Sequence, residues 1–269
     1  MNSYDSYINM QKSLYEDTNI PSKQIVGHYE WHEMVPYETF LLYKNGDIRQ
    51  PIINETHDKT ALDFGCGPGR MVKRMEKYFK RVDGVDISER LIKEARQNCP
   101  AGNFYVSKGD DLGDAPVNTY DFVYSTITMQ HIAVRSIRLN ILKCIREVLN
   151  DKGVVNIQMA FSKDFPYNST NVHDISKDKK VFVKTLDNTH ASWFEDRTDA
   201  SATNSGCDVG IGPADVPLVV GDFYKYFKNI KIWFYDYTLL EIKPESITHR
   251  VYSRDYYWAT HYIFIYGEK

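Results

Sequence analysis

The sequence has no long hydrophobic run. None of its 269 residues lies in an apolar stretch that approaches the ~18 residues of a membrane-spanning helix. Residues 1–19 are too polar for a secretory signal peptide. The four cysteines lack the C-x-x-C spacing of metal or redox sites, which is typical of reduced thiols in a cytoplasm. We therefore expect a cytoplasmic protein with no membrane attachment.

An excess of positive charge is also missing. The 33 Lys and Arg residues are outnumbered by 36 Asp and Glu residues, which gives a net charge of −3. Binding to a long nucleic acid depends on basic residues that neutralise phosphates. The composition therefore argues against nucleic acid as a partner.

Strands and helices alternate from residue 60 onward. Buried strands are predicted where short apolar runs end in acidic or polar residues, at 60–64, 81–87, 103–110, 120–127 and 154–161. Helical spacing follows the first, second and fourth of these runs, with Ser88 as an N-cap. Short connections between such elements favour a doubly wound, mostly parallel α/β sheet.

Two segments differ from this pattern. Residues 1–55 are polar and aromatic with weak helical signals at 8–15 and 37–43, and we interpret them as a lid or substrate segment. Residues 162–215 are polar and lack a sustained period, which suggests an insertion over the active-site edge of a 56–269 domain. A predicted helix at 216–227 precedes two late strands.

The stretch "ALDFGCGPGR" places glycines directly behind the first strand. Gly65, Gly67 and Gly69 give G-x-G-x-G rather than the G-x-G-x-x-G of dinucleotide folds, and Arg70 occupies the place of the last small residue. Asp63, just before the turn, has the wrong sign for a pyrophosphate. It has the right sign for a ligand that carries an ammonium or sulfonium, such as S-adenosylmethionine.

Two more acids end the next strands. Asp86 lies 21 residues after Gly65, where a carboxylate accepts hydrogen bonds from ribose hydroxyls. Asp110 and Asp111 end the third strand, within reach of an adenine amino group. Each acid alone is equally explained as a helix cap or turn former. Together with the glycines they indicate an adenosine-containing cation.

These stretches resemble the class I S-adenosylmethionine-dependent methyltransferases. The likeness covers "ALDFGCGPGR", "VDGVDIS", "VSKGDDL", "YDFVYSTITMQHI" and "ILKCIREVLNDKGVVNIQ", about residues 58–160. The late "KNIKIWFYDY" and "YYWATHYIFIYG" resemble the family's final hairpin. The resemblance implies a seven-stranded sheet with a C-terminal antiparallel hairpin.

The resemblance also implies a cofactor site, with S-adenosylmethionine as donor and S-adenosylhomocysteine as product. Asp63 and the turn would hold the methionine part, Asp86 the ribose, and Asp110 and Asp111 the adenine. The full expected set is Asp63, Gly65, Cys66, Gly67, Gly69, Arg70, Asp86, Ile87, Asp110, Asp111, Ser125 and Thr126.

His131, in "TMQHI" just past the fourth strand, is the candidate general base. The alternative is that it caps the next helix or contacts substrate without moving a proton. Further candidates for substrate contact are Tyr29, Trp31, His32, Gln130 and His190.

A metal is not favoured. His28 and His32 are four residues apart, but no third ligand is defined near them. His190 stands with Asp187, Glu195 and Asp199 in a polar loop, and such a loop is more often simply solvated.

The acceptor class is narrowed by missing motifs. The Asn/Asp-Pro-Pro-aromatic motif of base-amine methyltransferases is replaced by "STIT", and the Pro-Cys of cytosine-C5 enzymes is absent. We therefore predict O-methylation of a sugar, a sugar conjugate or another small polar metabolite. N-methylation of a small amine or amino sugar is the alternative. A non-catalytic S-adenosylmethionine-binding protein and a NAD-dependent reductase also stay open.

Overall fold

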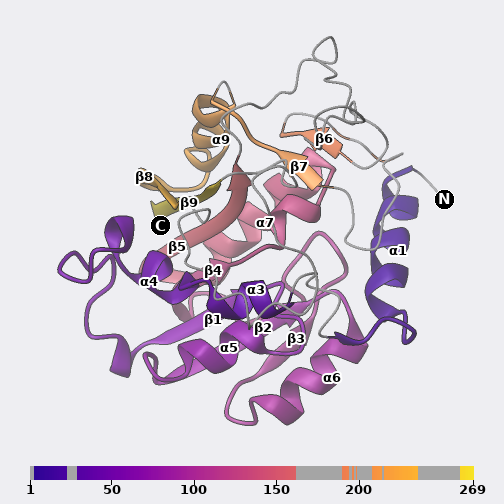
Figure 1. The fold of residues 1–269 in the computed structure, drawn as a ribbon, viewed down its shortest axis with the longest axis horizontal. Coiled ribbons are helices and arrows are strands. Elements are labelled where there is room, and N and C mark those ends of the chain that lie inside the picture. The colour runs from indigo at the N-terminus through magenta and orange to yellow at the C-terminus, as the bar shows by residue number, and fades with distance from the viewer. Residues whose placement is uncertain are drawn as a thin grey trace, which may run out of the picture.

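In the computed structural model, seven strands form one mixed sheet in the order β3-β2-β1-β4-β5-β9-β8 (Figure 1). The structure describes residues 3–22, 29–161, 190–193, 196, 198, 208–213, 215–235 and 261–269. The strands of the sheet are β1 (Thr60–Phe64), β2 (Arg81–Asp86), β3 (Phe104–Val106), β4 (Tyr120–Ser125), β5 (Leu149–Phe161), β8 (Lys228–Tyr235) and β9 (His261–Glu268).

The strand pairing confirms the predicted α/β fold. β1 pairs in parallel with β2 and β4, so the carboxyl ends of these three strands meet at one edge. β9 runs antiparallel to both β5 and β8, which is the expected C-terminal hairpin. Two short strands, β6 (His190–Ser192) and β7 (Asp208–Gly210), pair separately.

Helices cover both faces of the sheet (Figure 1). The helices are α1 (Ser3–Glu16), α3 (Tyr29–Met34), α4 (Tyr37–Leu42), α5 (Arg70–Met75), α6 (Glu89–Asn98), α7 (Arg135–Val148) and α9 (Val216–Phe223), with 3-10 turns η1 (Lys44–Gly46), η2 (Thr56–Asp58) and η3 (Met129–His131). Alternate residues of β1 belong to two separate cores. Leu62 packs in a cluster with α7, α9 and Tyr7 of α1, whereas Ala61 packs in a cluster with α4, α5 and α6.

Two predicted strands have different bounds in the structure. β5 begins at Leu149 rather than at 154, because its pairing with β4 shifts from Tyr120↔Leu149 to Phe122↔Val154 and the residues between them form a bulge. β3 is shorter than predicted and ends at Val106, so residues 107–110 belong to a loop. The predicted N-terminal helix is longer and spans all of α1.

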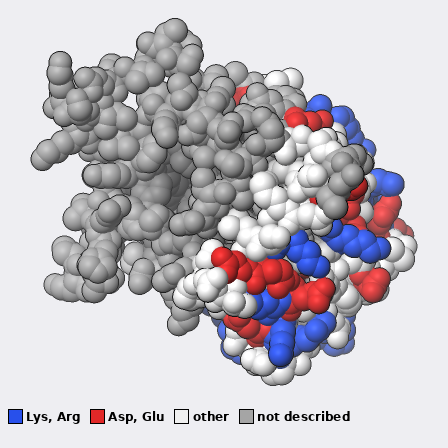
Figure 2. Space-filling view, turned by 90° about the vertical axis from the view of Figure 1, so that its right-hand side faces the viewer, with Lys and Arg blue, Asp and Glu red and all other residues white. Residues whose placement is uncertain are grey.

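Most of the predicted insertion at 162–215 lies outside the described residues. Its described parts are β6, β7 and a few neighbouring positions. Among the described residues, no helix is long and apolar enough to cross a membrane. Lys and Arg side chains are interspersed with Asp and Glu side chains over the described part of the face in Figure 2, so that part shows mixed charge.

Candidate functional site

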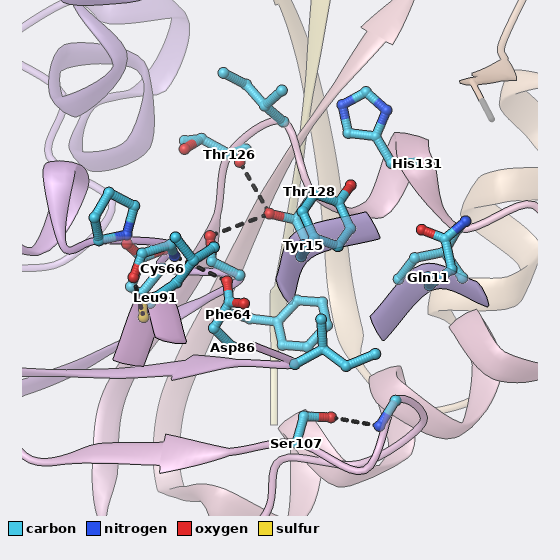
Figure 3. Close-up of a pocket in the computed structure, with 18 of the residues that line it drawn as sticks. Gln11, Tyr15, Phe64, Cys66, Asp86, Leu91, Ser107, Thr126, Thr128 and His131 are labelled. Carbon is cyan, nitrogen blue, oxygen red and sulfur yellow. Dashed lines mark hydrogen bonds between the residues drawn. The ribbon is translucent and has the colours of Figure 1, made fainter. Parts of the chain in front are cut away.

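A cavity opens at the carboxyl ends of β1, β2 and β4 (Figure 3). Its walls come from α1, the glycine turn after β1, the start of α6, and the loops that follow β3 and β4. Open α/β sheets bind ligands at this edge. In Figure 3, Asp86 and Cys66 lie to one side and His131 lies to the other, with Thr128 and Tyr15 of α1 between them.

The glycine turn brings bare backbone to the cavity. The amides of Gly65 and Cys66 both donate to the Val85 carbonyl, at 2.8 and 3.0 Å, which fixes the turn against β2. Gly65 has a φ of +76°, and a Cβ there would lie 2.0 Å from the Thr128 hydroxyl oxygen. Gly67 has a φ of +53°, and its missing Cβ would meet open space. Glycine at these two positions therefore permits both the backbone conformation and close approach of a ligand.

Asp63 lines the cavity and has one buried carboxylate oxygen without a partner among the described residues. Its side chain is 1% exposed, and its Oδ1 has no hydrogen-bond partner among the described residues. Burial raises the pKa of Asp63 to about 8, an effect that Arg70 opposes and Asp86 reinforces. A buried acceptor without a donor is costly, so this oxygen favours a cationic or hydrogen-bond-donating ligand.

Asp86, at the end of β2, forms hydrogen bonds with the glycine turn and with the start of α6. Its Oδ2 accepts from the Gly67 amide at 2.9 Å, and its Oδ1 accepts from the Ser88 amide at 2.9 Å. Burial raises the pKa of this carboxyl, although the amide hydrogen bonds oppose the shift. Each carboxylate oxygen retains a second lone pair for a ligand hydroxyl.

His131 ends η3 and lines the cavity. Its backbone amide donates to the Thr128 carbonyl at 3.0 Å. The same turn contains Thr128, whose hydroxyl lies 3.3 Å from the Gly65 carbonyl and 3.2 Å from the Thr126 carbonyl. The candidate base and the glycine turn are therefore parts of one hydrogen-bonded unit.

Nine residues predicted from sequence line this cavity. They come from three separate segments of the chain, 63–70, 86–87 and 126–131. They are Asp63, Gly65, Cys66, Gly67, Arg70, Asp86, Ile87, Thr126 and His131. Their roles toward a ligand stay predictions.

Three predicted residues serve the scaffold instead. The Gly69 amide donates to the Cys66 carbonyl at 3.0 Å, and its own carbonyl accepts from the thiol of Cys99, at the end of α6, at 3.4 Å. The Ser125 hydroxyl donates to the Phe64 carbonyl at 2.8 Å. Gln130 accepts from the Ala160 amide at 2.9 Å. None of the three lines the cavity.

Neither residue expected at the adenine lines the cavity, and their roles toward a ligand stay predictions. Asp110 accepts from the Tyr4 hydroxyl at 3.0 Å and from the Asn140 amide group at 3.3 Å. Asp111 closes its own loop by accepting from the amides of residues 108 and 113. Both side chains are engaged away from the cavity, which is lined at this loop by Ser107 and Gly109.

The aromatic and histidine candidates fall into two groups. His32 is buried, and its Nδ1 lies 2.8 Å from the Tyr37 hydroxyl, so it belongs to the packing between α3 and α4 and does not line the cavity. The side chains of Tyr29, Trp31 and His190 lie outside the described residues, as do the residues proposed beside His190. No cluster of three metal-ligating side chains occurs in the part of the chain that the structure describes.

The sequence indicated a lid or substrate segment at residues 1–55, but it did not identify the residues of α1 that line the cavity. Tyr7, Gln11 and Tyr15 line the cavity together with Ile8. Their spacing of four residues places them on one helix face. That spacing was visible in the sequence, but nothing local showed what the face covers.

Comparison with known proteins agrees with this geometry. Residues 61–153 match the family described as a methyltransferase domain. This part of the chain belongs to the class I S-adenosylmethionine-dependent methyltransferases. A methyltransferase structure from Leishmania major shares the fold, with a TM-score of 0.58 and 13% identity, over 100% of this chain and 87% of that one.

Curated members of the family act on different acceptors. An N-terminal Xaa-Pro-Lys N-methyltransferase from Xenopus laevis is 28% identical over 44% of this chain and 54% of its own length. A trans-aconitate 2-methyltransferase from Paracidovorax citrulli is 26% identical over 45% of each chain. The chain thus spans about half the length of the curated relatives that it matches.

S-adenosylmethionine is the methyl donor of this family, and the cavity fits it. The unpaired Asp63 oxygen suits the ammonium of the methionine part. The open space at Gly67 leaves room beside it. Asp86 has acceptor capacity left for hydroxyl donors.

Proposed function

We propose that this methyltransferase moves the methyl group of S-adenosylmethionine to a hydroxyl of a small polar acceptor, such as a sugar or sugar conjugate. The observation that carries the proposal is the buried, unpaired Asp63 oxygen beside a glycine turn with open space. It is supported by His131, which lines the same cavity on the side of β4.

Different residues would bind different parts of the cofactor. Asp63 accepts from the ammonium of the cofactor, and Asp86 accepts from the ribose hydroxyls. The backbone at Gly65 and Gly67 allows the methionine part to lie against the turn. Thr126 lines the cavity where β4 ends, and it would face the methionine part of the cofactor. Alignment of two reactants in one cavity supplies most of the rate in such a transfer.

His131 would act on the acceptor. When bound, the cofactor supplies a sulfonium-activated methyl group, so the protein needs only to orient the acceptor and remove its proton. A histidine near neutral pH is suited to take that proton. The α1 side chains over the cavity exclude water around it.

Methylation of an amine is the second candidate. The relative from Xenopus laevis is named as an amine methyltransferase, and an amine acceptor that arrives unprotonated needs no strong base. In that case His131 would contact the acceptor without being required for proton removal.

One substitution separates the two candidates. We expect His131→Gln to lower kcat by about 10²–10⁴-fold if an oxygen is methylated, the range for losing a general base. The assay follows radiolabelled methyl transfer to panels of sugars, polycarboxylates, amines and peptides with free N-termini. The exposed His57→Gln variant is the matched control. Retention of most of the activity in His131→Gln, with an amine as the accepted substrate, would replace the first candidate by the second.

A further inference from the structure

Helix α1 connects the two sides of the cavity. At its C-terminal end, the Tyr15 carbonyl accepts from the Ser88 hydroxyl at 3.2 Å and from the Arg90 guanidinium at 3.0 Å. Glu16 accepts from the Glu89 amide at 2.6 Å. This end is therefore joined to the first turn of α6, next to Asp86.

The other end of α1 reaches the turn that carries His131. The Tyr7 side chain is 2% exposed. Its hydroxyl accepts from the Ala133 amide at 2.7 Å and from the Gln11 side chain at 3.2 Å. It donates to the His131 carbonyl at 3.4 Å. One hydroxyl thus uses its proton and both lone pairs, and two of its three bonds go to the backbone that flanks His131.

A second buried side chain, that of Arg138, holds the backbone between His131 and Ala133. Arg138 is completely buried and donates to the carbonyls of Ile132 and Trp193. Its guanidinium also lies 4.6 Å from the centre of the Trp193 ring. The backbone from His131 to Ala133 is therefore fixed from α1 on one side and from α7 on the other.

We propose that Tyr7 is a positioning residue that holds the turn carrying His131. The helix that lines the cavity thereby also fixes the position of the candidate base. The inference rests on the proposed function. Tyr7 moves no proton of the reaction. It acts through two hydrogen bonds to the backbone on the carboxyl side of the imidazole, at the His131 carbonyl and the Ala133 amide.

The test measures the reactivity of the His131 ring in the full-length protein. Diethyl pyrocarbonate modifies accessible, neutral imidazoles, and peptide mass spectrometry gives the rate at each histidine, with exposed His57 as the internal reference. In Tyr7→Phe we expect His131 to react about threefold to tenfold faster, because the loss of one net hydrogen bond raises the population of the displaced turn by about that factor. The rate at His57 should stay unchanged.

Tyr4→Phe is the matched control. Tyr4 lies on the same helix, and its hydroxyl contacts Asp110 rather than the His131 turn, so this variant should leave the His131 rate unchanged. Gln11→Met removes one partner of the Tyr7 hydroxyl and should accelerate His131 less than Tyr7→Phe does. In the acceptor assay, Tyr7→Phe should lower kcat while the dissociation constant for S-adenosylhomocysteine changes less than about twofold.

The outcomes separate this inference from the proposed function. A wild-type rate at His131 in Tyr7→Phe, or equal acceleration in Tyr7→Phe and Tyr4→Phe, overturns the positioning role. Failure of the wild-type protein to bind S-adenosylhomocysteine in calorimetry overturns the proposed function instead, whatever the histidine rates.

Discussion

Asp63 has an environment that its position in the sequence does not reveal. The sequence places an acid before the glycine turn, which predicts a cationic ligand. The structure adds that this acid is fully buried and that one of its oxygens has no partner among the described residues. Because burial raises the pKa of Asp63 to about 8, the cavity without ligand holds a largely protonated carboxyl at neutral pH.

This protonation predicts a pH-dependent affinity. An ammonium beside Asp63 favours the ionised carboxyl and lowers its pKa, so ligand binding releases a proton below pH 8. We expect the affinity for S-adenosylhomocysteine to rise by up to about tenfold per pH unit between pH 6 and 8. Asp63→Asn should flatten this slope. Calorimetry in buffers of different ionisation enthalpy measures the proton release, and a flat profile in the wild-type protein would contradict the assignment.

At the scale of elements, the glycine turn is where sequence and structure agree best. An apolar strand followed by G-x-G-x-G predicts a strand, a tight turn and a helix, and β1 and α5 follow that order. Local sequence suffices here because positive φ values can be adopted at low cost only by glycine.

Alanine substitutions at Gly65, in the turn, and at Gly221, in α9, should have opposite effects on stability. Gly65→Ala should lower the free energy of unfolding by about 1–3 kcal/mol and weaken ligand binding, because it combines a positive φ with a collision against Thr128. Gly221→Ala, at an open position in α9, should raise stability by about 0.5–1 kcal/mol. Urea unfolding of both variants checks the contrast. Equal effects would show that the turn relaxes without cost.

Other elements could not be predicted because their roles depend on distant partners. The loop after β3 offered Asp110 and Asp111 to a ligand, but Tyr4 and the loop's own amides engage them. Helical spacing identified part of α1, whereas its place over the cavity depends on contacts with residues 73 to 75 and 124 to 126 positions away. No local pattern encodes such contacts.

At the scale of the whole molecule, one buried carboxylate joins three segments. Asp222 of α9 accepts from Arg135 of α7 at 2.7 and 3.0 Å, from Lys225 at 2.7 Å and from the Trp193 indole at 2.9 Å. Burial alone would raise the pKa of Asp222, but these donors outweigh it and leave the pKa below its ordinary value. The segment around Trp193 is thereby tied to the domain that carries the site.

Removal of this carboxylate should destabilise the fold. We expect Asp222→Ala to lower the free energy of unfolding by about 2–3 kcal/mol at pH 7, because charged and indole donors lose their acceptor. Since the native pKa lies below the unfolded value, this stabilisation is present above the unfolded pKa of 3.8 and disappears as the pH falls through the native value. Denaturant unfolding at pH 7 and pH 3 measures both effects. Glu147→Ala, which removes an exposed ion pair with Lys143, is the control and should change stability little.

The acceptor remains the part of the activity that neither sequence pattern nor fold determines. Relatives of this chain methylate both a small polycarboxylate and a protein N-terminus, according to their names. Acceptor choice depends on side chains around the cavity, which differ among proteins that share the sheet.

The proposed roles of Asp63, Asp86 and His131 all depend on S-adenosylmethionine binding in the cavity at the ends of β1, β2 and β4. Calorimetric titration of the full-length protein with S-adenosylhomocysteine and, separately, with NAD tests it most directly. We expect saturable one-to-one binding of S-adenosylhomocysteine, weakened by about 1–3 kcal/mol in Asp86→Ala, and no binding of NAD. Binding of NAD in place of S-adenosylhomocysteine, or an unchanged dissociation constant in Asp86→Ala, would contradict it.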